Sequence, residues 1–319
     1  MKCLVTGATG FVGRHLSKAL AAAGHEVVGL ARASGSQDGS VGFPLYAVDL
    51  LDAAAVDLAL LEVRPDWLFH LAGYANAGRS FCEPEAAWSG NLQATQSLYT
   101  AIERSGLRPR ILFVSSGLVY GDAEPGTPAF DELAPLQPAS PYAASKAATD
   151  ILSYQQTRSP GLDIVRVRPF NQIGPKQSAE YAAANFVRQI VAIERGKQES
   201  KLVTGDLSAA RDLTDVRDMV QAYIRLLEVG KSGDVFNAGS GRTYVMRDVF
   251  NTLIAMCRVK MDVEERPDPT RAKDTAVTRA DTTKLSAATG WTPAYSLEQS
   301  LRDMLADTRK ASGAAEAAR

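Results

Sequence analysis

The chain has 319 residues, 45% hydrophobic and 22% charged, which are ordinary values for a globular protein of one large or two closely joined domains. A formal net charge of -1 gives no electrostatic reason to expect a nucleic acid or an anionic membrane as partner. The three cysteines, Cys3, Cys82 and Cys257, are far apart and do not suit a disulfide framework or a metal cluster. We therefore expect a small-molecule substrate, no metal and a cytoplasmic location.

The first half of the chain alternates short apolar runs with longer amphipathic ones, which indicates a β-α repeat. The predicted elements are 2–6, 11–24, 26–30, 44–48, 66–72, 91–106 and 110–116. Runs such as LFHLA (68–72) are apolar throughout, as expected when helices cover both faces of a parallel sheet. The predicted fold class is α/β, a doubly wound parallel (Rossmann) sheet, and we expect no targeting segment and no membrane span.

The β-α rhythm loosens after about residue 170. Residues 183–196, 201–205 and 234–240 read as parts of a smaller mixed α/β lobe. We predict a nucleotide-binding domain over 1–170, to which some later segments return, and a substrate lobe over 171–310. Residues 311–319 lack an apolar stripe and are expected to form a frayed tail.

A glycine turn lies at the first strand-to-helix junction. Gly7, Gly10 and Gly13 let the backbone approach a pyrophosphate at the positive end of the helix that follows. At the end of the second strand, an acidic residue would bind the 2′-hydroxyl of NAD, but Ala31 and Arg32 stand there instead. A guanidinium suits a 2′-phosphate, so NADP(H) is favoured and NAD(H) stays possible, while Arg32 as a plain surface residue is the alternative.

Asp49 ends the third predicted strand, where the adenine of a dinucleotide would lie. The alternative is that Asp49 caps the helix predicted at 52–62.

Tyr142 and Lys146 are four residues apart at the start of a predicted helix, so both side chains leave the same face. An ammonium near a phenol stabilises the phenolate, and we expect it to lower the phenol's pKa from about 10. Ser115 and Ser116 end the strand ILFVS. A tyrosine and a lysine at this spacing are common on helix surfaces, but together with the glycine turn and the serines they indicate a proton-transfer site.

These motifs resemble the extended short-chain dehydrogenase/reductases of the nucleotide-sugar branch, over essentially the whole chain. The matching pieces are TGATGFVG, DL at 49, HLAG, SSGLVYG, PYAASK, RPFNQIG, RDLTDVRD and FNAGSG. The resemblance implies a catalytic triad of Ser116, Tyr142 and Lys146, with Ser115 beside it. It also implies cofactor contacts from Gly7, Thr9, Gly10, Phe11, Val12, Gly13, Arg32, Asp49, Leu50, Leu71, Ala72, Gly73, Ser115, Tyr142, Lys146 and Pro169.

Three reactions share this triad in the family: 4-epimerisation, 4,6-dehydration and 4-keto reduction. The 4,6-dehydratases look like S/T-x-E here, with a glutamate two residues before the tyrosine at the place of Tyr120. Leu118 occupies that place and cannot take a proton. The resemblance therefore implies hydride and proton exchange at one carbon without elimination.

The second half looks most like the GDP-6-deoxy-4-keto-D-mannose reductases of this family, which yield GDP-D-rhamnose from a ketone that a partner dehydratase supplies. It departs from them at Gln172 and Lys176, where that group usually has histidine and glycine.

A nucleotide diphosphate calls for fixed cations, and the expected substrate contacts are Ser80, Ser116, Asn171, Asn185, Arg188, Arg211 and Arg271. Solvated arginines and an asparagine turn are the alternatives. His15, His25 and His70 are interpreted as structural.

The rival functions are an NAD-dependent nucleotide-sugar 4-epimerase, a GDP-mannose 4,6-dehydratase and a non-catalytic NADP-sensing protein. Since Ala31 with Arg32 favours a dissociable NADPH, the sequence predicts a reductase. The resemblance also implies a homodimer through helices of the large lobe.

Overall fold

Seven strands form one parallel sheet in this computed structural model, which describes residues 1–32, 42–123, 126–266 and 277–317. The strand order is β10-β6-β5-β4-β1-β2-β3. Their bounds are β1 Lys2–Thr6, β2 Glu26–Ala31, β3 Leu45–Ala47, β4 Trp67–His70, β5 Arg110–Val114, β6 Ile164–Pro169 and β10 Val235–Ala238. Because all six pairings are parallel, the carboxyl ends of β1, β4, β5 and β6 meet at one edge.

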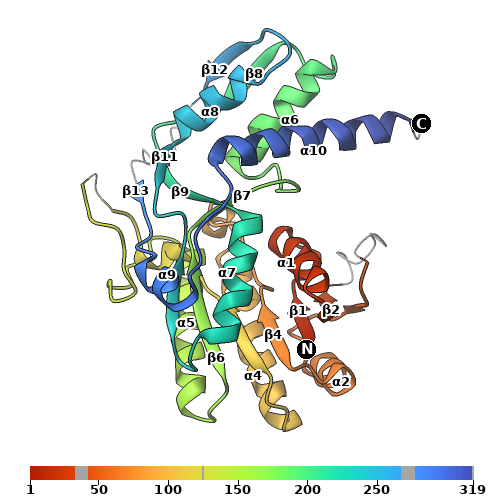
Figure 1. The fold of residues 1–319 in the computed structure, drawn as a ribbon, viewed down its shortest axis with the longest axis vertical. Helices are drawn as coiled ribbons and strands as arrows, with labels where there is room; N and C mark the ends of the chain where they lie inside the picture. Colours follow the sequence, from red (N-terminus) through yellow and green to blue (C-terminus); the bar gives the residue numbers. More distant parts are fainter. Residues whose placement is uncertain (33–41, 124–125, 267–276, 318–319) are drawn as a thin grey trace.

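Helices cover both faces of this sheet (Figure 1). One apolar core packs α1 (Phe11–Ala22) and α7 (Val216–Val229) against side chains such as Cys3 and Val5. The other packs α2 (Ala53–Val63) and α4 (Ala94–Ser105) against Leu4 and its neighbours. Consecutive strand residues such as Leu4 and Val5 thus enter opposite cores, which explains why apolar residues follow one another without alternation in these strands.

The remaining large-lobe elements follow the same layers. Helix α3 (Pro84–Trp88) leads into a π-helical turn, Ser89–Gln93, and α5 (Pro141–Arg158) packs beside β6. Helix α9 (Thr283–Thr289) lies against α7 and β10.

The small lobe holds the rest of the chain (Figure 1). Strand β9 (Ala210–Asp215) pairs with β7 (Asn171–Ile173), β11 (Thr243–Val245) and β13 (Val277–Thr278), and β8 (Lys201–Thr204) pairs with β12 (Asp262–Glu265). A third apolar core joins these strands to α6 (Ala182–Glu194), α8 (Met246–Ala255) and α10 (Leu297–Ala317).

The predicted α/β class and parallel sheet are confirmed, and β10 does return to the large sheet. Two predicted elements need correction. Residues 91–106 do not form one regular helix, since the π-helical turn precedes α4. The tail is helical through Ala317, because alanine and glutamate are strong helix formers even without an apolar stripe. No helix in the described ranges has the length and apolar character that spanning a bilayer needs.

Candidate active site

The turn between β1 and α1 is built for close approach of a ligand to the backbone. The amide of Gly7 donates to the Leu30 carbonyl at 2.9 Å, which ties the turn to the end of β2. A Cβ on Gly13 would lie 2.2 Å from the Gly7 carbonyl oxygen, so only glycine fits there. Gly10 caps α1 without a side-chain hydrogen bond, and the first turn holds no acidic residue. The helix N-terminus therefore suits an anion such as a pyrophosphate.

Two exposed polar residues stand at the next strand ends. Arg32 follows β2 directly, in the position expected for a partner of a 2′-phosphate. Asp49 is also exposed, and its carboxylate accepts the Leu51 amide at 3.0 Å. The alternative that Asp49 caps the next helix is wrong, because Asp52 accepts the first amides of α2 at 3.1 Å.

The loop after β4 packs closely against two side chains of the catalytic region. A Cβ on Gly73 would lie 2.4 Å from Asn91 Oδ1 and 3.5 Å from Lys146 Nζ. Glycine is therefore required for the loop to pass, and its neighbours Leu71 and Ala72 are half-buried. The backbone of this loop thus lies close to the Lys146 ammonium.

The three residues of the predicted triad come from β5 and α5. Ser116 follows β5, and its Oγ accepts the Leu118 amide at 3.2 Å. Tyr142 lies in the first turn of α5, which Ser140 caps by accepting the Ala143 amide at 3.2 Å. The Tyr142 phenol lies close enough to Ser116, at the carboxyl edge of the sheet, for the serine hydroxyl to lower the phenol's pKa. The structure therefore brings these hydroxyls together.

Burial dominates the electrostatics of the site. It raises the pKa of Tyr142 to about 12, an effect that the nearby Ser116 hydroxyl partly offsets, and lowers the pKa of Lys146 to about 8. Lys146 Nζ donates to the Val114 carbonyl at 3.0 Å. The expectation that Lys146 lowers the pKa of Tyr142 is wrong for this structure, because loss of hydration outweighs any effect of the ammonium. Tyr142 thus keeps its proton near neutral pH and is suited to donate it.

The remaining predicted cofactor residues lie along the same sheet edge. Thr9, Phe11 and Val12 lie in the turn and at the start of α1, Leu50 follows β3, Ser115 follows β5 and Pro169 ends β6. Ser115 is 3% exposed.

The predicted substrate residues are more scattered. Asn171 opens β7, and Asn185 and Arg188 share one face of α6, where the guanidinium donates to Asn185 Oδ1 at 3.0 Å. Arg211 lies on β9 and donates to the Ala210 carbonyl at 3.1 Å. Arg271 lies outside the described residues.

Ser80 does not face an open site. Its side chain is fully buried in a short 3-10 helix, Arg79–Phe81, and its hydroxyl donates to the Ala77 carbonyl at 2.6 Å. The predicted contact of Ser80 with a sugar therefore has no support in this conformation.

The two departures from the reductase pattern have local explanations. Lys176 has φ 71°, in the left-handed region that favours glycine, and its ammonium pairs with Asp307 at 3.5 Å. Gln172 donates to the Tyr223 hydroxyl at 3.3 Å, which turns the amide toward α7.

Two residues of the site were missed by the sequence interpretation. Tyr181, at the start of α6, lies near enough to raise the pKa of Tyr142 further. Asn91 lies in the π-helical turn and donates to Ser145 Oγ at 2.9 Å. No pattern in the sequence marks the π-helical turn, whereas the position of Tyr181 just before an apolar helix is a weak signal.

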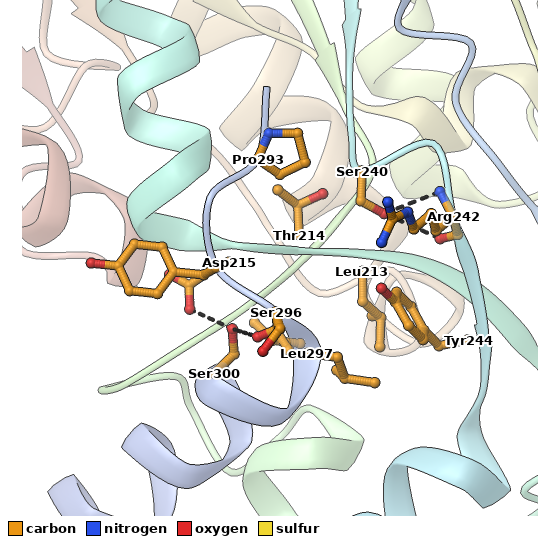
Figure 2. A pocket seen from close by; sticks show the side chains of 12 residues that line it. Leu213, Thr214, Asp215, Ser240, Arg242, Tyr244, Pro293, Ser296, Leu297 and Ser300 are labelled. Atoms are coloured by element: carbon orange, nitrogen blue, oxygen red, sulfur yellow. Dashed lines mark hydrogen bonds between the residues drawn. The ribbon is translucent and has the colours of Figure 1, made fainter. Parts of the chain in front are cut away.

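A cavity of about 100 Å³ lies apart from these residues, between β9, β11 and the start of α10 (Figure 2). Ser240, Arg242, Tyr244 and Ser296 line it, and Ser300 donates to Asp215 there at 2.6 Å. None of the predicted catalytic or cofactor residues lines this cavity, so it is not the catalytic site.

Comparison with known proteins gives a consistent result. A family model described as GDP-mannose 4,6 dehydratase matches residues 4–304. The chain is 35% identical to a GDP-6-deoxy-D-mannose reductase of Pseudomonas aeruginosa, over 96% of each chain. Its fold is similar to that of RMD from Pseudomonas aeruginosa complexed with NADPH, with TM-score 0.85, 32% identity and coverage of 97% and 100%. It is also similar to a Thermus thermophilus UDP-glucose 4-epimerase in complex with NAD, with TM-score 0.86, 29% identity and coverage of 98% and 100%.

Proposed function

Because the chain belongs to the GDP-mannose 4,6 dehydratase family, in the nucleotide-sugar branch of the extended short-chain dehydrogenase/reductases, we propose that it is an NADPH-dependent reductase. Its substrate is the C4 ketone of GDP-4-keto-6-deoxy-D-mannose and its product is GDP-D-rhamnose. One observation carries the proposal: a protonated, half-buried Tyr142 lies near Ser116, one helical turn before Lys146 on α5, and the aliphatic Leu118 lies beside Ser116.

The residues present fit a dinucleotide. The uncapped N-terminus of α1 and the backbone cradle of Gly7 and Gly13 suit its pyrophosphate, and Arg32 suits a 2′-phosphate. When bound, NADPH supplies the hydride that reduces C4 of the sugar. The cofactor preference rests on Arg32 and on the NADPH complex of the similar protein RMD.

The proton comes from Tyr142. In the proposed reaction, Ser116 Oγ donates to the ketone oxygen and polarises the carbonyl, while the Tyr142 hydroxyl transfers its proton to the same oxygen as negative charge develops there. A phenol with a pKa of about 12 before substrate binds is fully protonated at neutral pH. The Lys146 ammonium then stabilises the phenolate that this transfer leaves behind.

Leu118 favours reduction over dehydration. A 4,6-dehydratase must also remove a proton from the sugar, and the half-buried Leu118 provides no base. The family name of the matching model includes dehydratases, yet the 35% identical relative is a reductase.

Recognition of the substrate falls to the small lobe. Arg211, Asn171 and the Arg188–Asn185 pair are our candidates for holding the nucleotide diphosphate, with Arg271 as a further candidate from its sequence alone. The GDP base and the configuration at C4 follow the similar Pseudomonas aeruginosa enzyme.

We further propose a homodimer, which the outer face of α5 supports. Ile151 and Tyr154 are 60% and 46% exposed on this helix, although such side chains are usually buried. An upstream dehydratase as pathway partner and a cytoplasmic location remain predictions.

An epimerase is the second candidate, since UDP-glucose 4-epimerases are among the similar proteins. An epimerase retains its nicotinamide through each turnover, whereas a reductase must release it. The purified protein should therefore carry no stoichiometric NAD(H), and it should consume NADPH when a separate dehydratase supplies the ketone. Replacing Tyr142 by Phe should lower this rate about 100- to 10,000-fold with NADPH affinity kept. Tightly bound NAD with C4 epimerisation of a nucleotide sugar would replace our proposal by the epimerase.

A further inference from the structure

His70 is a buried titratable residue that the proposed reaction does not use. It ends β4 and is 1% exposed. Its two ring nitrogens lie 2.8 Å from hydroxyl oxygens on opposite sides, Nδ1 from Thr6 and Nε2 from Thr95. Both threonines are buried as well. A histidine held on both sides in this way has one orientation and one place for its proton.

The neighbouring bonds fix the position of that proton. The Ala72 amide donates to Thr6 Oγ1 at 3.1 Å, and Thr95 Oγ1 donates to the Asn91 carbonyl at 2.6 Å. The only hydroxyl proton of Thr95 is thus already used, so Thr95 must accept from His70 Nε2. Thr6 then donates its own proton to His70 Nδ1. Only the neutral Nε2–H tautomer places a hydrogen in every one of these contacts.

The same chain continues into the catalytic helix. Asn91 Nδ2 donates to Ser145 Oγ at 2.9 Å, and Ser145 Oγ donates to the Tyr142 carbonyl at 2.8 Å. Asn91 and Ser145 are 1% and 0% exposed, so no water competes for these bonds. Two series of hydrogen bonds therefore meet at Asn91, one from the Ala72 amide through His70 to the Asn91 carbonyl and one from the Asn91 side chain to the backbone of Tyr142.

We propose that His70 is a positioning residue that, as its neutral Nε2–H tautomer, holds the loop Leu71–Gly73 at a fixed distance from Tyr142. The loop packs at Gly73 against Asn91 and Lys146, so its position sets the space between the predicted cofactor contacts and the proton donor. The role in turnover rests on the proposed reductase function, whereas the tautomer and the hydrogen-bond chain do not.

The surroundings of the ring keep it neutral. Burial and the Lys146 ammonium lower the pKa of His70 to about 3. The Tyr99 and Phe113 rings pack beside it, with centroid distances of 6.4 and 6.0 Å. A second proton on His70 would place a donor against Thr6 and a positive charge near Lys146. The chain of bonds is therefore insensitive to pH across the neutral range.

The first test is nitrogen NMR of the whole protein with ¹⁵N-labelled histidine. The sequence has three histidines, so variants His15→Gln and His25→Gln assign the remaining signals to His70 without altering it. We expect His70 to show a pyridine-like Nδ1 and a pyrrole-like Nε2, unchanged between about pH 5.5 and 7, below the pKa of about 8 of the nearby Lys146. An Nδ1–H tautomer, or a His70 signal that titrates in this range, would overturn the proposal.

The second test breaks the chain at Thr95. Thr95→Val keeps the shape and removes the hydroxyl, while Thr95→Ser keeps the hydroxyl. Thr149→Val is the matched control, because Thr149 is equally buried and also donates to a carbonyl four residues earlier, that of Ser145 at 2.6 Å. The Thr149 hydroxyl makes no hydrogen bond with His70, whose ring nitrogens contact Thr6 and Thr95. We expect faster amide hydrogen exchange over residues 71–73 in Thr95→Val than in Thr149→Val, with the wild-type rate in Thr95→Ser.

In the reductase assay, Thr95→Val should lower kcat about 10- to 100-fold while the KM values change less than about threefold, and Thr95→Ser should restore kcat. Equal exchange rates in the two valine variants would refute the positioning role even if the protein had a different activity. Altered exchange without reductase turnover would instead count against the proposed function alone. Altered exchange with turnover, but with equal kcat in both valine variants, would refute the catalytic part of the role.

Discussion

Replacing Lys146 by Met should make the protein more stable at neutral pH while it removes activity. Lys146 is 7% exposed, and burial lowers its pKa from 10.5 to about 8. A shift of this size corresponds to about 3 kcal/mol of destabilisation when the lysine is charged. Met fills the same space without a charge, but the Val114 carbonyl loses its partner, which costs about 1 kcal/mol. The expected net gain at pH 7 is therefore about 2 kcal/mol.

The gain should depend on pH in a defined direction. Between about pH 8 and 10.5 the folded protein releases the Lys146 proton while the unfolded chain retains it, so the wild type gains stability as pH rises. The advantage of Lys146→Met should shrink over this window, vanish near about pH 9.5 and reverse above it, because each pH unit is worth about 1.4 kcal/mol and the lost bond to Val114 remains. Tyr142, whose pKa is raised to about 12, is present in both proteins and cancels in the difference.

Urea unfolding of both proteins without cofactor, at pH 7, 8.5 and 9.5, measures this difference. Lys284→Met is a suitable control, because Lys284 also donates to a backbone carbonyl, that of Val235 at 2.9 Å, but is exposed. A Lys146→Met variant that is less stable than the wild type at pH 7, or a difference that does not change with pH, would refute the reasoning. Lys146 would then be a structural residue, not a strained catalytic one.

Three further predictions follow from other parts of the chain. Arg32→Ala should weaken NADPH binding about 10- to 100-fold with little change in NADH binding, since it removes a charge-assisted pair worth about 1.5–3 kcal/mol. Titrations in which the affinities for NADPH and NADH fall equally would contradict the role of Arg32. With GDP-mannose and NADP the protein should form no 4-keto-6-deoxy sugar, because Leu118 is no base, and detection of that product by NMR would reverse this interpretation. Arg64→Gly should raise the free energy of unfolding by about 0.5–1 kcal/mol, because Arg64 ends α2 at φ 47°, in the left-handed region that favours glycine. An unchanged or lower urea midpoint would argue against strain at this position.

The parts of the fold that depend on local pattern were predictable from the sequence. Strand β1, the glycine turn and α1 follow from an apolar run, three glycines and a helical period, all within the first 24 residues. Tyr142 and Lys146 were found together because a spacing of four places two side chains on one helix face. Ser115 and Ser116 were noted at the end of a neighbouring strand, but the choice of Ser116 as the third member of the triad came from the resemblance to the family.

The parts that depend on long-range packing were not predictable. The π-helical turn places Asn91 between Gly73 and Ser145, and no residue pattern encodes such a turn. The pKa of Tyr142 was expected to fall because the spacing revealed the ammonium, but the spacing says nothing about how much water the folded chain removes. Ser80 looked available in a loop, yet it is buried and bonded to Ala77.

The proposed reduction is tested most directly by following the hydride. When NADPH carries deuterium at the transferred position of its nicotinamide, one NADPH should be oxidised for each GDP-4-keto-6-deoxy-D-mannose supplied. NMR should then find the deuterium at C4 of a GDP-6-deoxyhexose with the configuration of GDP-D-rhamnose. The labelled product should form about 100- to 10,000-fold more slowly when Tyr142 is replaced by Phe, since proton and hydride transfer complete the same reduction. A product without deuterium at C4, or no consumption of NADPH by a protein that epimerises nucleotide sugars with its own bound NAD, would contradict the account.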